Sequence, residues 1–458
     1  MLNDESSRTP ANGPGGAESE PAPESGAGSG AGSDSGSDSG SDSGSDSGSG
    51  AASGEAYQNP IDSSLSRPFR FKARPEDFIV EELPLDVEEP DPTGTHVWFE
   101  IEKRGISTPD ATRRLGRALN RQPQDIAFAG RKDAVAVTRQ RMSIEHVSID
   151  DLLALDLDGI QIRNPYRCRR KLRVGQLAGN RFHLRLTGIA QETRDGLATE
   201  LEELQRTGVP NAYGDQRFGR GGGGLALGRA LVKGTPLEYL GCLVDECARG
   251  PQSEAGIELL RRIREGNTSE LRRATELVRP LTDDLRAVAR TLARRRPEDP
   301  AELVRAVPQR SRSFHLAILQ AKMFNDVLAA RVADGSFATP LLGDVVRAAD
   351  GRHSVLKEMP APEGRLVTGP IWSSDMLAAT GRPGEIELDA LHAEGLVPED
   401  LTRPGGLRPR GARRPLTAAI GGVLTEEWTG EAVWIAFDLP VGSYATVVLD
   451  ELARRVSV

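Results

Sequence analysis

The sequence predicts one α+β domain that is split in two along the chain, with a second domain inserted between its parts. Alternating apolar and polar residues, typical of strands, are interspersed with capped amphipathic helices over residues 67–224. After a run of glycines the chain becomes mostly helical, and the strand-and-helix pattern returns only over residues 416–458. The mixture of elements in the split domain fits an α+β or an α/β arrangement.

The first elements are two short strands around a turn at residues 74–77, followed by a clearer strand over residues 95–103. In the clearer strand, every second side chain is large and apolar, so one face is expected to be buried. A helix should follow, because Thr108 is a suitable N-cap and Pro109 suits the first helical position.

The next elements surround a charged turn. A short apolar strand over residues 126–129 runs into the turn at residues 130–133, and another strand should leave it. Residues 180–189 alternate again and predict a strand. Residues 193–207 predict a helix that ends at Gly208.

The inserted region has two textures. Residues 225–332 are mostly helical in pattern, with Arg and Glu at spacings that support exposed helix faces. Residues 334–415 are rich in Gly and Pro and carry few helix signals. The sequence therefore divides into a tail (1–66), the first part of the split domain (67–224), an inserted domain (225–415) and the last part of the split domain (416–458).

Residues 1–66 have the composition of a disordered tail. They are dominated by Gly, Ser, Ala and acidic residues, with four SDSG repeats over residues 33–48. Such a segment cannot bury enough apolar surface to offset its ordering entropy, and it lacks the apolar stretch of a signal peptide. The segment carries eleven acidic residues and one Arg. Because the net charge of the whole chain is −9, the rest of the chain is close to neutral. Any nucleic-acid surface must then be a local basic patch.

Several classes of protein are disfavoured by what the sequence lacks. No stretch approaches 18 consecutive apolar residues, so no membrane span is expected. Cys168, Cys242 and Cys247 suit a reducing cytoplasm, and no second cysteine pair or nearby His completes a metal site. The chain has no phosphate-binding P-loop, H-E-x-x-H or G-x-S-x-G motif. ATP-driven, zinc-dependent and serine-hydrolase functions are therefore disfavoured.

One block of the chain has a single sign of charge. Between Asp158 and Glu192 there is no acidic residue, while eight basic residues occur. Five of them fall within seven positions, and these are Arg167, Arg169, Arg170, Lys171 and Arg173. A one-sign block before a strand is what a phosphate backbone attracts, and the alternative is a basic surface loop without a partner.

Asp133 is the candidate catalytic carboxylate. It follows Arg131 and Lys132 and precedes apolar residues, so its basic neighbours would hold it ionised beside a dry pocket. That setting suits a nucleophile or a general base, although a turn aspartate often only caps its own backbone. Asn180 and Phe182 could read and stack on a base, although an isolated Phe is more often part of a core.

The stretch over residues 208–224 contains seven glycines together with aromatic and basic residues. Glycine allows RNA backbone to approach closely, so this stretch could contact RNA. It could equally be a hinge between domains, and the sequence does not separate the two.

Together these segments resemble the TruD family of tRNA pseudouridine synthases. The resemblance covers residues 67–458 and rests on seven motifs in family order. They are FKARPEDFIVEE at Phe71, GRKDAVAVTRQ at Gly130, GNRFHLRL at Gly179, GVPNAYGDQRFG at Gly208, QAKMFNDVLAAR at Gln320, TGPIW at Thr368 and LPVGSYATVVLDEL at Leu439. The family fold implied is the pseudouridine-synthase α+β fold, circularly permuted, with a mixed, mainly antiparallel sheet and an inserted, mostly helical α+β domain.

The resemblance implies a role for individual residues. Asp133 takes the place of the nucleophilic aspartate and Lys72 that of its basic partner. The positions that line the uridine pocket are Phe78, Asn180, Phe182 and Tyr444. Tyr444 stands where some members have Phe, which preserves stacking and adds a hydroxyl group. The implied substrate is the uridine at position 13 of the tRNA D-arm.

The implied reaction is an isomerisation, so it needs no redox change, no energy input and no cofactor. We therefore expect a cytoplasmic enzyme whose partner is tRNA, with no metal, nucleotide cofactor or membrane. Two alternatives remain at this point. One is an RNA-binding protein without chemistry, and the other is a carboxylate-based hydrolase of nucleosides or RNA.

Overall fold

The computed structural model describes residues 67–85, 89–132, 134–218, 223–250, 252–265, 270, 273, 276–278, 281–295, 297–426 and 428–456. Asp133 and the acidic tail lie outside these described residues. The prediction of a disordered tail and the catalytic assignment of Asp133 therefore fall on parts of the chain that the structure does not describe.

The described residues form one large sheet of eight strands in the order β13-β14-β6-β1-β4-β2-β5, with β3 also paired to β4. Its strands are β1 (Phe78–Pro84), β2 (His96–Arg104), β3 (Ala127–Phe128), β4 (Val137–Glu145), β5 (Ile160–Cys168), β6 (Leu177–Leu186), β13 (Gly421–Thr425) and β14 (Val433–Pro440). β1 and β4 run parallel, and the other pairings in this sheet are antiparallel. The prediction of an α+β fold with a mixed, mainly antiparallel sheet is confirmed.

β6 joins segments that are far apart in the sequence. It pairs along most of its length with β1 on one side and with β14 on the other. In this register Phe182 lies between Val80 and Phe437. Through β6, a strand near the end of the chain is joined to the first strand that the structure describes.

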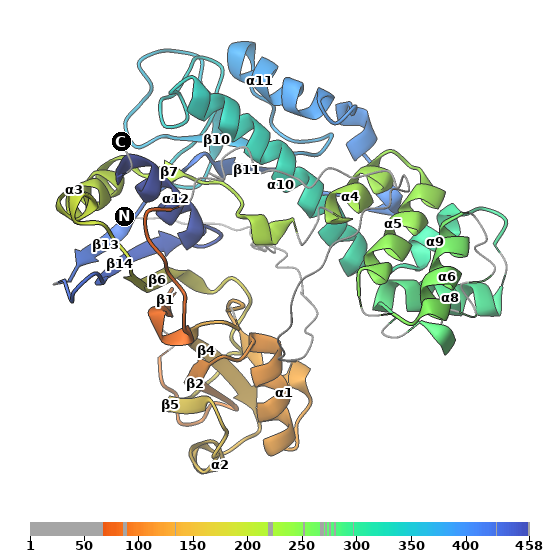
Figure 1. Ribbon diagram of the computed structural model, residues 1–458, viewed down its shortest axis with the longest axis horizontal. Helices are drawn as coiled ribbons and strands as arrows, with labels where there is room; N and C mark the ends of the chain where they lie inside the picture. Colours follow the sequence, from red (N-terminus) through yellow and green to blue (C-terminus); the bar gives the residue numbers. More distant parts are fainter. Residues whose placement is uncertain are drawn as a thin grey trace, which may run out of the picture.

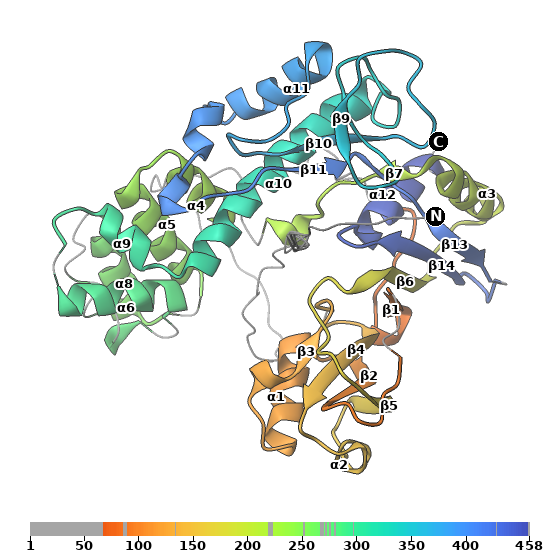
Figure 2. The same cartoon turned by 180° about the vertical axis from the view of Figure 1, so that it is seen from behind.

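Helices of the described part of the chain flank the large sheet, with α1 near β2 and β4 and with α3 and α12 near β13 and β14 (Figures 1 and 2). These helices are α1 (Thr108–Ala118), α2 (Ile149–Leu153), α3 (Gln191–Thr207) and α12 (Ala445–Val456). The helices α3 and α12 share a core with β6 and β14, whereas α1 shares a separate core with β2 and β4. The two cores lie on the same face because Val80 and Thr138 are paired and paired residues point the same way.

The opposite face carries a row of alternating charge that crosses the sheet. We call the charge row the residues Asp438, Arg181, Glu81, Arg139, Glu102 and Arg163. Arg181 Nε lies 2.7 Å from Asp438 Oδ1, and Arg139 Nε lies 2.8 Å from Glu102 Oε2. Arg139 also pairs with Glu81, so each charge has an opposite neighbour on the next strand.

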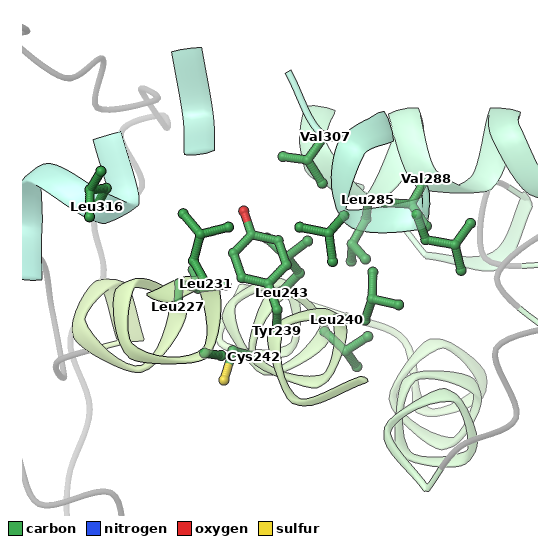
Figure 3. Packing of buried hydrophobic residues seen from close by; sticks show 14 of the residues in the cluster. Leu227, Leu231, Tyr239, Leu240, Cys242, Leu243, Leu285, Val288, Val307 and Leu316 are labelled. Carbon is green, nitrogen blue, oxygen red and sulfur yellow. The ribbon is translucent and has the colours of Figure 1, made fainter. Parts of the chain in front are cut away.

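The inserted region contains a helical part with its own core. Its helices are α4 (Gly223–Val232), α5 (Pro236–Ala248), α6 (Glu254–Arg264), α8 (Asp283–Arg294), α9 (Ala301–Ala306) and α10 (Gln309–Ala333). Figure 3 shows Tyr239 of α5 surrounded by leucine and valine side chains, among them Leu231, Leu243 and Val307. The Tyr239 hydroxyl lies 2.8 Å from His315 Nδ1, so the buried polar group has a partner.

A second sheet lies beside α10. It has the order β11-β10-β8-β9, with β8 (Val345–Arg347), β9 (His353–Val355), β10 (Leu366–Ile371) and β11 (Ala412–Pro415). The helix α11 (Gly381–His392) falls in the Gly- and Pro-rich stretch where few helix signals were expected, so that interpretation is wrong for this segment. Two glycines and a proline in its first turn hide the helix, which is stabilised by burial of Ile386 and Leu391.

A short two-stranded ribbon connects the two sheets. β7 (Val209–Pro210) pairs with β12 (Thr417–Ala418), so the chain entering the inserted region lies beside the chain leaving it. Adjacent entry and exit points are what an insertion into a continuous domain requires. The domain boundaries drawn from the sequence remain predictions.

The start of the described chain is fixed to the last helix. Arg67 Nε donates to Asp450 Oδ1 over 2.6 Å, and the Asp450 side chain is buried.

We predict that a chain beginning at Arg67 melts at the same temperature as the full chain, because the removed segment cannot form a core. Adding Arg67→Ala should lower the free energy of unfolding by about 1–3 kcal/mol, because Asp450 loses a buried partner. Thermal melting followed by circular dichroism compares the three proteins, and a lower midpoint for the shortened chain alone would contradict the prediction.

Candidate active site

The loop that leads to Asp133 leaves β3 along one edge of β4. β2 pairs with the whole of the other edge, so β1 and β3 must share this one. β1 pairs as far as Arg139, and β3 pairs with Met142 and Ser143. A gap in strand pairing therefore remains at Gln140 and Arg141.

The carboxylate of Glu82 fills this gap. Its Oε1 accepts a hydrogen bond of 3.3 Å from the backbone N–H of Arg141, and its Oε2 lies 2.9 Å from Lys132 Nζ. The side chains of Glu82 and Lys132 are only 2% and 5% exposed. The sequence suggested that both basic neighbours hold Asp133 ionised, but the structure pairs Lys132 with Glu82, so its charge is already balanced.

Thr108 and Gln140 fix the backbone of the same loop. The Thr108 hydroxyl donates to Gln140 Oε1 over 2.9 Å and accepts from the Lys132 backbone N–H over 2.9 Å. Gln140 Nε2 donates to the carbonyl oxygen of Gly130 over 3.0 Å. The prediction of Thr108 as N-cap is wrong: Ser107 caps α1 by accepting from the Asp110 N–H, and the Thr108 side chain is buried in the loop contacts instead.

Lys72 and Phe78 lie together on the helix-covered face. Lys72 has a φ of 61°, a left-handed conformation that a lysine rarely adopts. Its Nζ lies 4.4 Å from the centroid of the Phe78 ring, within cation–π range. An unfavourable backbone conformation that persists is a reason to suspect a functional constraint on the side chain.

Phe182 joins the same aromatic cluster. Its ring lies edge-on to Phe78 with centroids 6.1 Å apart, and it lies 5.7 Å from the ring of Phe437. Phe182 is 7% exposed, so it is part of the core as well as a neighbour of Phe78. The structure thus brings together three of the residues assigned to the site, namely Lys72, Phe78 and Phe182.

Asn180 has a buried acceptor without a partner. It lies opposite Glu82 on one neighbouring strand and opposite Leu439 on the other. Its Oδ1 is buried and accepts no hydrogen bond from any described residue. A buried amide oxygen left unpaired costs about 1–3 kcal/mol, so such a group calls for a role in binding or for a water molecule.

Tyr444 lies in a different cluster from Phe182. Its ring packs edge-on against Tyr213, with centroids 6.4 Å apart. Tyr213 is fixed by Asn325, which exchanges two hydrogen bonds of 2.9 Å with its backbone, and by the guanidinium of Arg414 at 4.3 Å from its ring. The expected pocket shared by Phe182 and Tyr444 is defined relative to Asp133 and stays a prediction.

The segment around Tyr213 connects the two sheets. The Asn211 N–H donates to the Leu416 carbonyl oxygen over 2.8 Å, and Arg414 Nη2 donates to Asn211 Oδ1 over 2.7 Å and to the Gly442 carbonyl oxygen over 2.8 Å. Ser443 Oγ also donates to Asn211 Oδ1 over 3.0 Å. These contacts hold residues 211–214 between the two sheets, and both sequence interpretations of the glycine-rich stretch, an RNA contact and a hinge, stay predictions.

The basic block forms a loop next to the start of the candidate catalytic loop. The Gly175 N–H donates to the Ala129 carbonyl oxygen over 2.8 Å, and Trp98 Nε1 donates to the Arg170 carbonyl oxygen over 2.7 Å. Leu172 is buried beneath, whereas the neighbouring basic side chains are exposed, and these are Arg169, Arg170, Lys171 and Arg173. Arg167 differs from them, because it is half-buried and donates to the Gly94 carbonyl oxygen.

The described residues contain no group of three or more His, Cys, Asp or Glu side chains arranged to hold a metal ion. The three thiols are buried, and burial raises the pKa of Cys242 to about 11. No helix in the described part of the chain combines the length and apolar character needed to cross a bilayer.

Comparison with known proteins gives one consistent result. The family model of tRNA pseudouridine synthase D (TruD) matches residues 68–452. The proteins named tRNA pseudouridine synthase D from Geobacter metallireducens and Geobacter sulfurreducens are each 36% identical, over 392 and 396 residues, covering 84% of this chain and 94% of theirs. The crystal structure of tRNA pseudouridine synthase D from Methanosarcina mazei superposes with a TM-score of 0.65 at 25% identity, covering 86% of this chain and 95% of that one.

The sheet and these matches define the chain as a pseudouridine synthase, an isomerase. More narrowly, the chain belongs to the tRNA pseudouridine synthase D (TruD) family. The resemblance seen in the seven sequence motifs is confirmed.

Sequence reasoning missed three side chains of the candidate site, and these are Glu82, Thr108 and Gln140. A signal for Glu82 was present, because it continues the alternation of Phe78 and Val80 and so places a carboxylate on the buried face. Thr108 gave no such signal, since its hydroxyl partners come from residues 132 and 140.

Proposed function

We propose that this pseudouridine synthase acts on tRNA and converts the uridine at position 13 of the D-arm, with Asp133 as its nucleophile. Lys72 keeps Asp133 ionised, and Phe78, Asn180, Phe182 and Tyr444 line the uridine pocket. The position in the D-arm and these roles rest on the residue-by-residue match to the family.

The observation that carries the proposed pocket is the unpaired Oδ1 of Asn180. Uracil offers one N–H donor at N3 between two carbonyl acceptors, and an asparagine amide can bond to a donor and an acceptor together. Asn180 lies opposite Glu82, whose partner Lys132 immediately precedes Asp133. A base bound to Asn180 would therefore lie near the residue proposed to act on it.

The reaction redistributes bonds without adding or removing atoms. The N1–C1′ bond breaks, the uracil rotates, and C5 forms the new bond to C1′. The proton on C5 is then lost and N1 gains one, so the balance needs no oxidant, reductant or cofactor. Asp133 either attacks the sugar, attacks the base or stabilises the charge that develops as the first bond breaks.

The target uridine must leave its stack to reach such a site. The exposed basic loop 169–173 is followed by Gly175, which bonds to the Ala129 carbonyl oxygen a few residues before Asp133, and the loop is suited to hold the tRNA backbone. This arrangement also fits an enzyme of the cytoplasm, where tRNA is present. An RNA-binding protein without chemistry would leave uridine unchanged, and a hydrolase would release base or cut the strand, whereas the proposed isomerase preserves both mass and chain length.

We expect Asp133→Asn to abolish turnover while tRNA binding survives, because the amide keeps the shape of the side chain but cannot act as a nucleophile. The loss in kcat should be on the order of 10⁴-fold or more. Pseudouridine at position 13 is measured in tRNA that lacks the modification, and binding is measured by gel shift. A variant that turns over within about tenfold of the wild type would refute the assignment.

Phe182 is predicted to stack on the uracil in addition to packing in the core. Truncation to Ala would confuse the two roles, because a buried Phe lost in this way costs about 3–5 kcal/mol of stability. Phe182→Leu keeps most of the volume, and Phe437→Leu, in the adjacent ring of the same cluster, is the matched control. Loss of a stacking ring costs roughly 1–3 kcal/mol, so kcat/KM should fall about 5- to 150-fold in the first variant only. Equal losses in both variants would mean that Phe182 serves only the core.

The basic loop is predicted to contact phosphates. Replacing Arg169, Arg170 and Lys171 by Gln should weaken binding of all tRNAs alike and reduce the slope of log Kd against log salt by up to about three. Arg169 pairs with Asp91, so the Gln variant also removes one intramolecular contact. The control replaces Arg352 and Arg382, two exposed arginines of the inserted region. An unchanged slope in the triple variant would show that the loop faces solvent in the complex.

A further inference from the structure

We propose that Glu82 is a positioning residue for the catalytic loop and acts through Lys132. The inference rests on the proposed role of Asp133, because Lys132 is the residue that immediately precedes it. Glu82 does not touch the substrate in this proposal. It fixes the side chain of Lys132 and thereby orients the backbone that leads to Asp133.

Three elements converge on three consecutive residues. β1 contributes Glu82 to the Lys132 ammonium, α1 contributes Thr108 to the Lys132 backbone N–H, and β4 contributes Gln140 to the Gly130 carbonyl oxygen. Gly130 itself is tightly enclosed, since a methyl group there would lie 3.1 Å from Lys132 Nζ. Side chains thus hold both ends of the Gly130–Lys132 segment, in the place where strand pairing is missing.

Stability alone does not explain the buried ion pair of Glu82 and Lys132. Taking both charges out of water offsets much of their attraction, and apolar replacements of similar volume are often equally stable. The two preceding side chains of β1 on this face are Phe78 and Val80, which are apolar and need no polar partner. This ion pair involves the residue just before the candidate nucleophile, so it is better explained by the backbone geometry that it imposes there.

The pair also controls the charge of Lys132. A free ammonium next to Asp133 could bind that carboxylate and compete with the substrate for it. Glu82 Oε2 lies 2.9 Å from the Lys132 ammonium in a buried pair, whereas Lys72 is the lysine proposed to act on Asp133. Glu82 therefore separates the two lysines into different tasks.

The test uses the double variant Glu82→Gln/Lys132→Met in the full chain. Gln keeps the shape of Glu, Met is one atom shorter than Lys, and no unpaired charge remains, while the amide oxygen at position 82 can still accept from the Arg141 N–H. We expect kcat to fall about 100-fold, as for small displacements of a catalytic group, with KM for tRNA within about threefold of the wild type. The matched control is Arg331→Met/Asp344→Asn, which removes another buried ion pair in the inserted region.

A second set of variants addresses the same loop without altering charge. Thr108→Val removes the hydroxyl that holds the Lys132 N–H and should lower kcat about tenfold, whereas Thr108→Ser keeps the hydroxyl and should restore it. These variants decide the matter if the double variant does not fold. Wild-type kcat in both the double variant and Thr108→Val would overturn the proposal, as would equal losses in the control pair. If Asp133→Asn remains active, the proposed function fails independently of these results.

Discussion

The antiparallel pairing of β6 with both β1 and β14 is the constraint on which the rest of the structure depends. It sets Asn180 opposite Glu82 and Leu439, and Phe182 opposite Val80 and Phe437. Without β14 the aromatic cluster would lack one side, and the turn that carries Tyr444 would have no fixed place. This pairing joins segments separated by the whole inserted region, so it incurs a large loop-closure entropy and is expected to form late in folding.

Much of this arrangement follows from local pattern, because alternation of side chains reports directly which face of a strand is buried. Strands β2 and β6 lie near their expected positions for that reason. The helix α11 was not expected, since its first turn has low helix propensity and its stability comes from burial against other elements. Tertiary packing of this kind leaves no trace in the local sequence.

The residues of the candidate site were also only partly predictable from local pattern. Asn180 and Phe182 were recognised because they follow a basic block and open an alternating strand. Thr108 was assigned to the cap of its own helix, which is the common local use of a threonine, and its actual partner on β4 is 32 positions away. Short-range rules identify residue types that suit a chemistry, whereas hydrogen bonds between distant elements decide which of several suitable residues is used.

The charge row on the open face has a consequence for how the strands find their alignment. A slip of two residues between β6 and β1 would keep apolar side chains on the buried face, so burial alone does not forbid it. The same slip would move Arg181 from Glu81 to Ile79 or Leu83 and break the alternation of charge between β6 and β1. Each correctly aligned charge pair contributes only a few tenths of a kcal/mol to about 1 kcal/mol. Summed over six neighbouring strands, these pairs favour one alignment over the alignments shifted by two residues. The exposed ion pairs thus favour one strand register where burial of the core does not. Added salt screens these pairs and would therefore weaken the preference for the correct register.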